Sequence, residues 1–154
     1  MNLNYEPVRL DELVKDSYTD AQILAGSSHV KVELAACDEV LVRGDRHRLR
    51  QLLLNLTDNA IKYNEPQGRV IITLNRSGNS ADLVISNTGP GIAPEKLPRV
   101  FDRFYRCDPA HSNEVEGCGL GLSIAQWIVR AHRGSIAIVT EPDALTRVTV
   151  RLPR

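Results

Sequence analysis

Helical spacing of apolar residues is clearest over residues 45–64. The apolar side chains there recur at intervals of three and four and form one face of the predicted helix: Leu49, Leu52, Leu53, Leu56 and Ala60. Asp45 stands immediately before this run, so we expect its side chain to cap the first turn. Weaker helical patterns cover residues 11–25, with Asp11 as a possible cap, and residues 120–132.

Alternation of apolar and polar residues predicts strands in much of the remaining chain. The pattern covers six segments: 29–35, 39–44, 69–77, 80–89, 134–140 and 146–153. We expect the first two to pair as a hairpin, and the next two to pair around the turn-prone dipeptide Gly78-Asn79. Helices and strands are segregated rather than alternating, which predicts an α+β fold with helices on one face of a mixed, mostly antiparallel sheet.

Composition narrows the classes of function. The length of 154 residues suits a single domain over 1–154, and 19 basic against 19 acidic residues leave no net charge to attract nucleic acid or an anionic membrane. No apolar run reaches the roughly 18 residues that span a bilayer, so we expect this chain not to be membrane-embedded. The cysteines, Cys37, Cys107 and Cys118, form no C-x-x-C pair, which favours a reducing, cytoplasmic location.

Glycine is concentrated just before the last predicted helix. Gly117, Gly119 and Gly121 alternate in the stretch GCGLGL, a spacing that fits neither a P-loop nor a dinucleotide-binding fingerprint. Glycines before a helix nevertheless let backbone N–H groups approach an anion, and the first turn of a helix carries a partial positive charge. The segment is either a phosphate site or a flexible hinge without a ligand.

A polar stripe runs along the helix predicted over 45–64. Asn55, Asn59 and Lys62 are spaced i, i+4 and i+7, which places them beside the leucine face. Asparagine is a poor residue for a helix interior, so two on one stripe indicate a use. An amide oxygen can ligate Mg²⁺ and an ammonium can meet phosphate oxygens, although a solvated helix face explains the same residues.

A third polar motif ends the strand predicted over 80–89. The stretch SNTGPGI places Asn87 before Gly89 and Gly91, where a flat ring can lie against bare backbone. An asparagine amide both donates and accepts, so Asn87 can pair with the edge of a purine. A tight turn with glycines at positive φ is the other interpretation.

Taken in order, four stretches resemble the catalytic and ATP-binding domain of bacterial two-component sensor histidine kinases, in the GHKL superfamily. NLTDNAIKY resembles its N box, NTGPG its first glycine box, VFDRFYR its F box and GCGLGL its second glycine box. The resemblance covers essentially the whole chain. It implies a Bergerat-type two-layer α/β sandwich with a mobile ATP lid at about 101–118.

The resemblance also implies roles for individual residues. Asn59 corresponds to the Mg²⁺ ligand, Lys62 and Tyr63 to residues that flank the phosphates and ribose, and Arg106, with Arg103, to stabilisers of γ-phosphate charge. Asn55 stands where superfamily ATPases keep a glutamate that activates water, which suits transfer over hydrolysis. The remaining ATP-binding positions implied are Asn87, Gly89, Gly91, Ile92, Gly117, Gly119, Leu120, Gly121, Leu122 and Thr146.

The implied function is binding of ATP and Mg²⁺ and transfer of the γ-phosphoryl group to a histidine. None of the four histidines of this chain has the sequence context of a phospho-acceptor, so we expect the acceptor on a separate dimerisation domain, docked through Phe101 and Phe104. A response regulator downstream and a parent protein anchored in the inner membrane are implied as well. The alternatives are a non-catalytic nucleotide-sensing or protein-binding module and a GHKL-type ATPase.

Asn87 departs from the family pattern, which has an aspartate that accepts the adenine amino proton. The amide oxygen accepts without charge, so we predict weaker ATP binding or relaxed choice of base. An Asn87→Asp variant that bound ATP no more tightly than the parent would contradict this.

Overall fold

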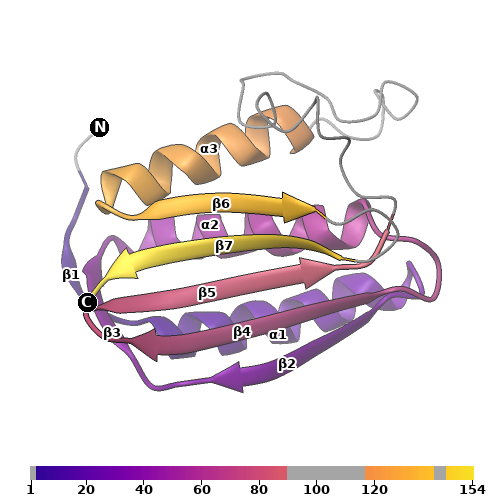
Figure 1. Cartoon of the computed structure of the whole chain (residues 1–154), viewed down its shortest axis with the longest axis horizontal. Helices are drawn as coiled ribbons and strands as arrows, with labels where there is room; N and C mark the ends of the chain where they lie inside the picture. The colour runs from indigo at the N-terminus through magenta and orange to yellow at the C-terminus, as the bar shows by residue number, and fades with distance from the viewer. Residues whose placement is uncertain (1–2, 90–116, 141–144) are drawn as a thin grey trace.

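The computed structural model describes residues 3–89, 117–140 and 145–154, with the side chains of 117–121 excepted. Its elements follow the order β1 (Glu6–Arg9), α1 (Leu10–Gly26), β2 (Lys31–Cys37), β3 (Leu41–Gly44), α2 (Arg46–Lys62), β4 (Arg69–Ser77), β5 (Ser80–Asn87), α3 (Gly117–Ala131), β6 (Ser135–Thr140) and β7 (Thr146–Pro153). Helices and sheet form two layers (Figure 1). The predicted α+β class is confirmed.

The main sheet has five strands in the order β2-β4-β5-β7-β6. β2 runs parallel to β4 and every other neighbouring pair is antiparallel, so the sheet is mixed and mostly antiparallel as predicted. The turn at Gly78 (φ 57°) joins β4 to β5. The predicted hairpin over 29–44 is wrong, because β2 pairs with β4 while β3 pairs with β1 in a separate two-stranded sheet.

Helix α2 begins and packs as its pattern predicts. The Asp45 side chain accepts a hydrogen bond from the Arg48 N–H at 3.0 Å, which confirms the predicted cap. The leucine face of the helix and Ala60 are buried in the core. Burying such side chains is the main favourable contribution to the stability of the two-layer packing.

Asp11 does not cap α1, contrary to the prediction, because the helix begins at Leu10 and Asp11 lies within its first turn. The side chain is buried and accepts hydrogen bonds from the Arg9 guanidinium at 2.9 Å and from the Val40 N–H at 3.2 Å. The bond from Arg9, with the weaker one from Val40, holds the pKa of the Asp11 carboxyl below its usual range. Asp11 therefore ties α1 to the chain that enters β3.

The helix-facing side of the sheet changes from apolar to polar at one end. Along β5, Leu83 and Ile85 point into the core and Asn87 continues the same alternation. Along β7, Val150 is in the core and Thr146 stands at the polar end of the alternation. The apolar core thus ends at a buried amide and a buried hydroxyl.

Candidate functional site

The candidate site begins on the last two turns of α2. Asn55 and Asn59 are half-buried beside the leucine face, and Lys62 is exposed. The Lys62 ammonium lies 2.9 Å from the Asp58 carboxylate one turn earlier. This surface ion pair keeps the ammonium at the end of the helix and is weak enough to be exchanged for another anion.

The Asn59 amide is the unusual polar group of this helix. Its Nδ2 is buried and has no hydrogen-bond partner in the described part of the chain. An unsatisfied buried polar group costs about 1–3 kcal/mol, so such groups are rare in folded proteins unless a ligand uses them. The amide oxygen is a hard donor that suits Mg²⁺, so Asn59 fits the metal that the sequence predicts.

Asn87 and Thr146 are brought together by the register of β5 and β7. They are directly paired in the antiparallel ladder, so their side chains lie on the same face of the sheet. Each is 9% exposed. The Thr146 hydroxyl lies 3.1 Å from the hydroxyl of Thr140 on β6. Asn87 and Thr146, two of the ATP-binding positions that the resemblance implies, are therefore neighbours in the fold although they are 59 positions apart in sequence.

Gly89 brings the end of β5 against the end of α2. It adopts φ 132°, and a Cβ at this position would lie 2.7 Å from the Tyr63 carbonyl oxygen. Only glycine fits this close approach without displacing backbone. Tyr63, at the C-terminal cap of α2, is half-buried beside it. The strand bearing Asn87 is thereby held next to the helix bearing Asn59.

Two residues that the sequence analysis missed complete this junction. The Thr88 hydroxyl donates to the Asn64 amide oxygen at 2.6 Å and accepts from the Arg69 N–H at 2.8 Å. The Asn64 amide nitrogen donates to the Arg69 carbonyl at 2.9 Å. The only signal in the sequence is the identity of Asn64 and Thr88 as polar residues flanking two elements, and no periodicity singles them out.

Helix α3 contributes its N-terminus to the same end of the molecule (Figure 1). It begins at Gly117, three residues before the predicted start, so Gly117, Gly119, Leu120 and Gly121 lie in its first turns. The first N–H groups of a helix lack intrahelical acceptors and bear partial positive charge. Leu122, 6% exposed, anchors this end in the core.

Several predicted site residues lie outside the described part of the chain. They are Gly91, Ile92, Phe101, Arg103, Phe104 and Arg106, with the proposed lid up to residue 116. Within the described part, no group of three or more His, Cys, Asp or Glu side chains could hold a metal ion.

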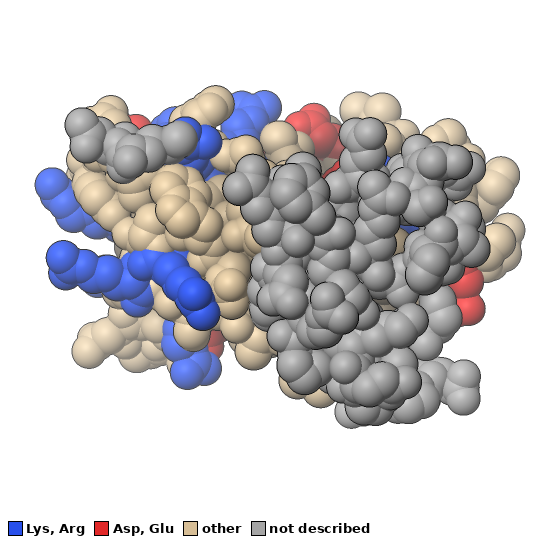
Figure 2. Space-filling view, turned by 90° about the horizontal axis from the view of Figure 1, so that it is seen from above, with Lys and Arg blue, Asp and Glu red and all other residues tan. Residues whose placement is uncertain are grey.

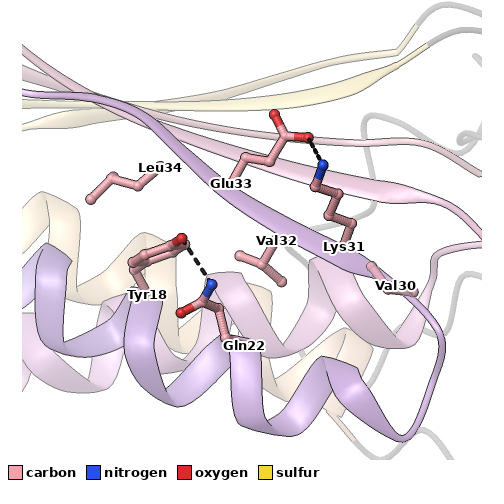
Figure 3. Close-up of a pocket in the computed structure, with 7 residues that line it drawn as sticks. All are labelled: Tyr18, Gln22, Val30, Lys31, Val32, Glu33 and Leu34. Carbon is pink, nitrogen blue, oxygen red and sulfur yellow. Dashed lines mark hydrogen bonds and ion pairs between the residues drawn. The ribbon is translucent and has the colours of Figure 1, made fainter.

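Further surface features lie outside the residues of this junction. A cavity lies between α1 and the edge strand β2 and is lined by Tyr18, Gln22, Val30, Lys31, Val32, Glu33 and Leu34 (Figure 3). Gln22 donates to the Tyr18 hydroxyl at 2.8 Å, and Glu33 pairs with Lys31 at 3.7 Å and with Arg69 at 3.0 Å. Lys and Arg side chains gather over the opposite end of α3 (Figure 2), where Arg130 stands in the last turn.

Among the described helices, none has the length and apolar character to cross a membrane.

Comparison with known proteins agrees with this geometry. Residues 44–154 match the family described as histidine kinase-, DNA gyrase B-, and HSP90-like ATPase. The sensor histidine kinase CusS of Escherichia coli is 40% identical over 116 residues, which are 75% of this chain and 24% of that protein. The chain thus spans about a quarter of the length of this relative.

Solved structures are similar over nearly the whole chain. The mycobacterial sensor histidine kinase MprB has a TM-score of 0.83 and 31% identity, covering 97% of both chains. Full-length ShkA has a TM-score of 0.82 and 27% identity, covering 99% of this chain and 32% of that one. With a family match over most of its length, the chain belongs to the histidine kinase-, DNA gyrase B- and HSP90-like ATPase family, as a catalytic domain of the sensor histidine kinase type.

Proposed function

We propose that this domain binds Mg-ATP and transfers the γ-phosphoryl group to a histidine on a separate dimerisation domain of a two-component sensor kinase. The observation that carries the proposal is the buried Asn59 amide nitrogen, which has no hydrogen-bond partner in the described chain. It lies on the helix that Gly89 packs against, next to the strand that ends in Asn87. A polar junction at the end of an apolar core is typical of a ligand site.

In this proposal each element of the junction binds one part of the nucleotide. The Asn59 amide oxygen holds Mg²⁺, which when bound neutralises phosphate charge. Lys62 exchanges its partner Asp58 for phosphate oxygens, and Tyr63 lies against the ribose. The N–H groups at the glycine-rich start of α3 receive phosphate oxygens. Arg103 and Arg106 add guanidinium donors for the γ-phosphate.

The base is assigned to the buried end of the β5–β7 pair. Asn87 reads the purine edge, Thr146 contributes a hydroxyl, and Gly89, Gly91 and Ile92 line the approach. Asn87 is the last residue of β5 and Thr146 is the first of β7, and the two are paired at the same edge of the sheet, on its helix-facing side. Adenine there would extend the apolar core and satisfy polar groups at its end.

Asn55 favours phosphoryl transfer over hydrolysis. A GHKL-type ATPase needs a carboxylate that activates water, and this helix presents an amide at the corresponding position. An amide cannot accept a proton at neutral pH, so water attack lacks a general base on this helix. We therefore rank transfer to a histidine above ATP hydrolysis and above a purely nucleotide-sensing role.

The remaining parts of the proposal concern the parent protein. Residues 101–118 act as the ATP lid of one domain over 1–154, and Phe101 and Phe104 dock on the dimerisation domain. Relatives such as CusS are about four times longer than the matched region, which leaves room for that domain and for a sensor in the inner membrane. We place this domain on the cytoplasmic side, with a response regulator downstream. The crystal structure of full-length ShkA, which shares this fold, is a complex with AMPPNP.

Phosphotransfer provides the test. The purified domain is mixed with radiolabelled ATP, Mg²⁺ and a helical hairpin that carries the acceptor histidine of its parent protein, beside a hairpin with that histidine replaced. We expect acid-labile label on the intact hairpin alone, at a rate lowered at least tenfold by Asn59→Ala. Good ATP binding with no transfer would favour the sensing module, and rapid release of phosphate without transfer would favour the ATPase.

A further inference from the structure

The orientation of the Asn87 amide is fixed by a backbone carbonyl. Its Nδ2 lies 2.8 Å from the carbonyl oxygen of Thr88. A carbonyl oxygen only accepts, so the atom facing it must be the amide nitrogen, which donates. The amide oxygen is then the group that Asn87 presents elsewhere, and no described residue bonds it.

Thr88 is itself held in place by hydrogen bonds to Arg69 and Asn64. Its N–H donates to the Arg69 carbonyl at 3.1 Å, and its hydroxyl accepts from the Arg69 N–H at 2.8 Å. The same hydroxyl donates to the Asn64 amide oxygen at 2.6 Å. Thr88, the residue whose carbonyl orients Asn87, is therefore held between the start of β4 and the chain that follows α2.

Asn64 has one possible orientation as well. Its nitrogen donates to the carbonyls of Ala60 and Arg69, at 3.3 and 2.9 Å, so its oxygen faces Thr88 and the Glu65 N–H. Gly68 leaves the space that this amide occupies. A Cβ at position 68 would lie 1.9 Å from the Asn64 oxygen and 2.5 Å from the Thr88 hydroxyl oxygen.

We infer that Thr88, held by Asn64, is a positioning residue that fixes the Asn87 amide so that its oxygen reads a 6-amino purine. The inference rests on the proposed function, since it concerns the base of the bound nucleotide. The sequence leaves two consequences open for Asn87, weaker ATP binding or relaxed choice of base, and this inference decides between them. Base choice stays strict, because the amide cannot rotate to offer its nitrogen, and only the strength of the contact falls for want of charge.

The chemistry of the purine 6-position gives the expected selectivity. Adenine carries an amino group there, which donates to the Asn87 oxygen. Hypoxanthine and guanine carry a carbonyl oxygen, which would face the Asn87 oxygen with no proton between them. Leaving two acceptors opposed at a buried site lowers affinity by at least about tenfold.

Calorimetric titration with ATP and with ITP, in Mg²⁺, tests this directly. For the wild-type chain we expect ATP to bind at least about tenfold more tightly than ITP. Thr88→Val removes the hydroxyl while keeping the volume, so the amide can turn and the ratio should fall below threefold. Thr88→Ser restores the hydroxyl and should restore the ratio.

A structural role alone would weaken both nucleotides equally, so an unchanged ratio in Thr88→Val would overturn the inference. A wild-type ratio below threefold would overturn it too. If Thr88→Val does not fold, Asn64→Ala frees the same hydroxyl and should lower the ratio in the same way. Failure of the folded wild-type chain to bind either nucleotide at millimolar concentration would overturn the proposed function itself, and this inference with it.

Discussion

The two ends of helix α2 differ in how far the protein itself supplies hydrogen-bond partners for their polar groups. At its N-terminus, the Asp45 carboxylate accepts from the N–H groups of Asn4, at 2.9 Å, and Arg48, at 3.0 Å. The Asp45 N–H donates to His132 Nε2 at 3.0 Å, and the other ring nitrogen of His132 lies 2.7 Å from the Ile128 carbonyl. Because Nε2 accepts, Nδ1 is the nitrogen that donates to the Ile128 carbonyl. At this end, which we call the closed end, the polar groups of Asp45 and His132 have their hydrogen-bond partners within the protein.

At the other end of α2, the polar groups exceed the partners that the described chain supplies. The Asn59 amide nitrogen is buried without one. Asn87 uses its nitrogen on Thr88 and keeps its oxygen for another group. The polar groups at one end of the helix are thus satisfied within the protein, whereas at the other end Asn59 and Asn87 keep polar atoms that our proposal assigns to a ligand. Substitutions of His132 and Asp45 at the first end should therefore lower stability, and substitution of Asn59 at the second end should lower binding.

The largest effect on stability is expected from His132→Ala. The ring is buried, is contacted edge-on by Tyr5 at 5.7 Å between centroids, and accepts from the Asp45 N–H. Its loss leaves a cavity and a buried donor without an acceptor, so the free energy of unfolding should fall by about 2–4 kcal/mol. Urea denaturation measures this.

The exposed His47→Ala is the matched control for His132→Ala and should lie within about 0.5 kcal/mol of wild type. Equal effects of the two substitutions would show that the closed end does not depend on the ring. ATP affinity of the folded His132→Ala protein should stay within about threefold of wild type if the ends act separately.

Asp45→Ala should cost about 1 kcal/mol at neutral pH, the usual value of an N-terminal cap. Hydrogen bonds from the N–H groups of Asn4 and Arg48 lower the pKa of the Asp45 carboxyl. The stabilisation is therefore complete above the unfolded pKa of about 4 and is lost as pH falls through the lower folded value. The difference between wild type and variant should narrow below about pH 4, and a constant difference would contradict the role of the charged form.

Arg133→Gly should stabilise the closed end by about 0.5–1 kcal/mol. Arg133 adopts φ 61° at the end of α3, in a left-handed conformation that glycine adopts without strain. The Gly134 N–H donates to the Val129 carbonyl at 2.9 Å, a pattern of helix ends that prefers glycine at position 133. Thermal unfolding measures the gain, and a lower melting temperature would refute the argument.

Asn59→Ala should have the smallest effect on stability, less than about 0.5 kcal/mol or slightly stabilising. The amide nitrogen bonds nothing in the described chain, and alanine is the better helix former. Asn64→Ala is the matched control, because it removes bonds to Thr88, Arg69 and Glu65 and should cost about 2 kcal/mol. A large loss in Asn59→Ala would mean that the amide serves the fold rather than a ligand.

Periodicity predicted the elements that pack by one face. The leucine face of α2, its Asp45 cap and the β4–β5 hairpin follow from local pattern and turn chemistry, and all are present. The hairpin over 29–44 failed because alternation identifies strands but not their partners. β2 is parallel to β4 across the intervening α2, and β3 pairs with β1, whose four residues are too few for a visible pattern.

The candidate site was predictable where residue type and spacing coincide. A polar stripe stood out in the sequence at Asn55, Asn59 and Lys62. The helix α2 that carries it buries the leucine face that the sequence predicts. Asp11 and the Asn64–Thr88 pair did not stand out, because their roles come from contacts between segments distant in sequence, with Val40 and Arg69 respectively. The meeting of Asn87 with Thr146 likewise follows only from strand register.

The most direct test of the role proposed for Asn59, at the C-terminal end of α2, is calorimetric titration with ATP, with and without Mg²⁺. The wild-type domain is compared with Asn59→Ala. We predict that Mg²⁺ tightens ATP binding to the wild-type chain at least tenfold, and that Asn59→Ala abolishes this dependence while the protein stays as stable as wild type. Equal dependence on Mg²⁺ in a folded Asn59→Ala variant would contradict the account, because Mg²⁺ would then not be held by the Asn59 amide.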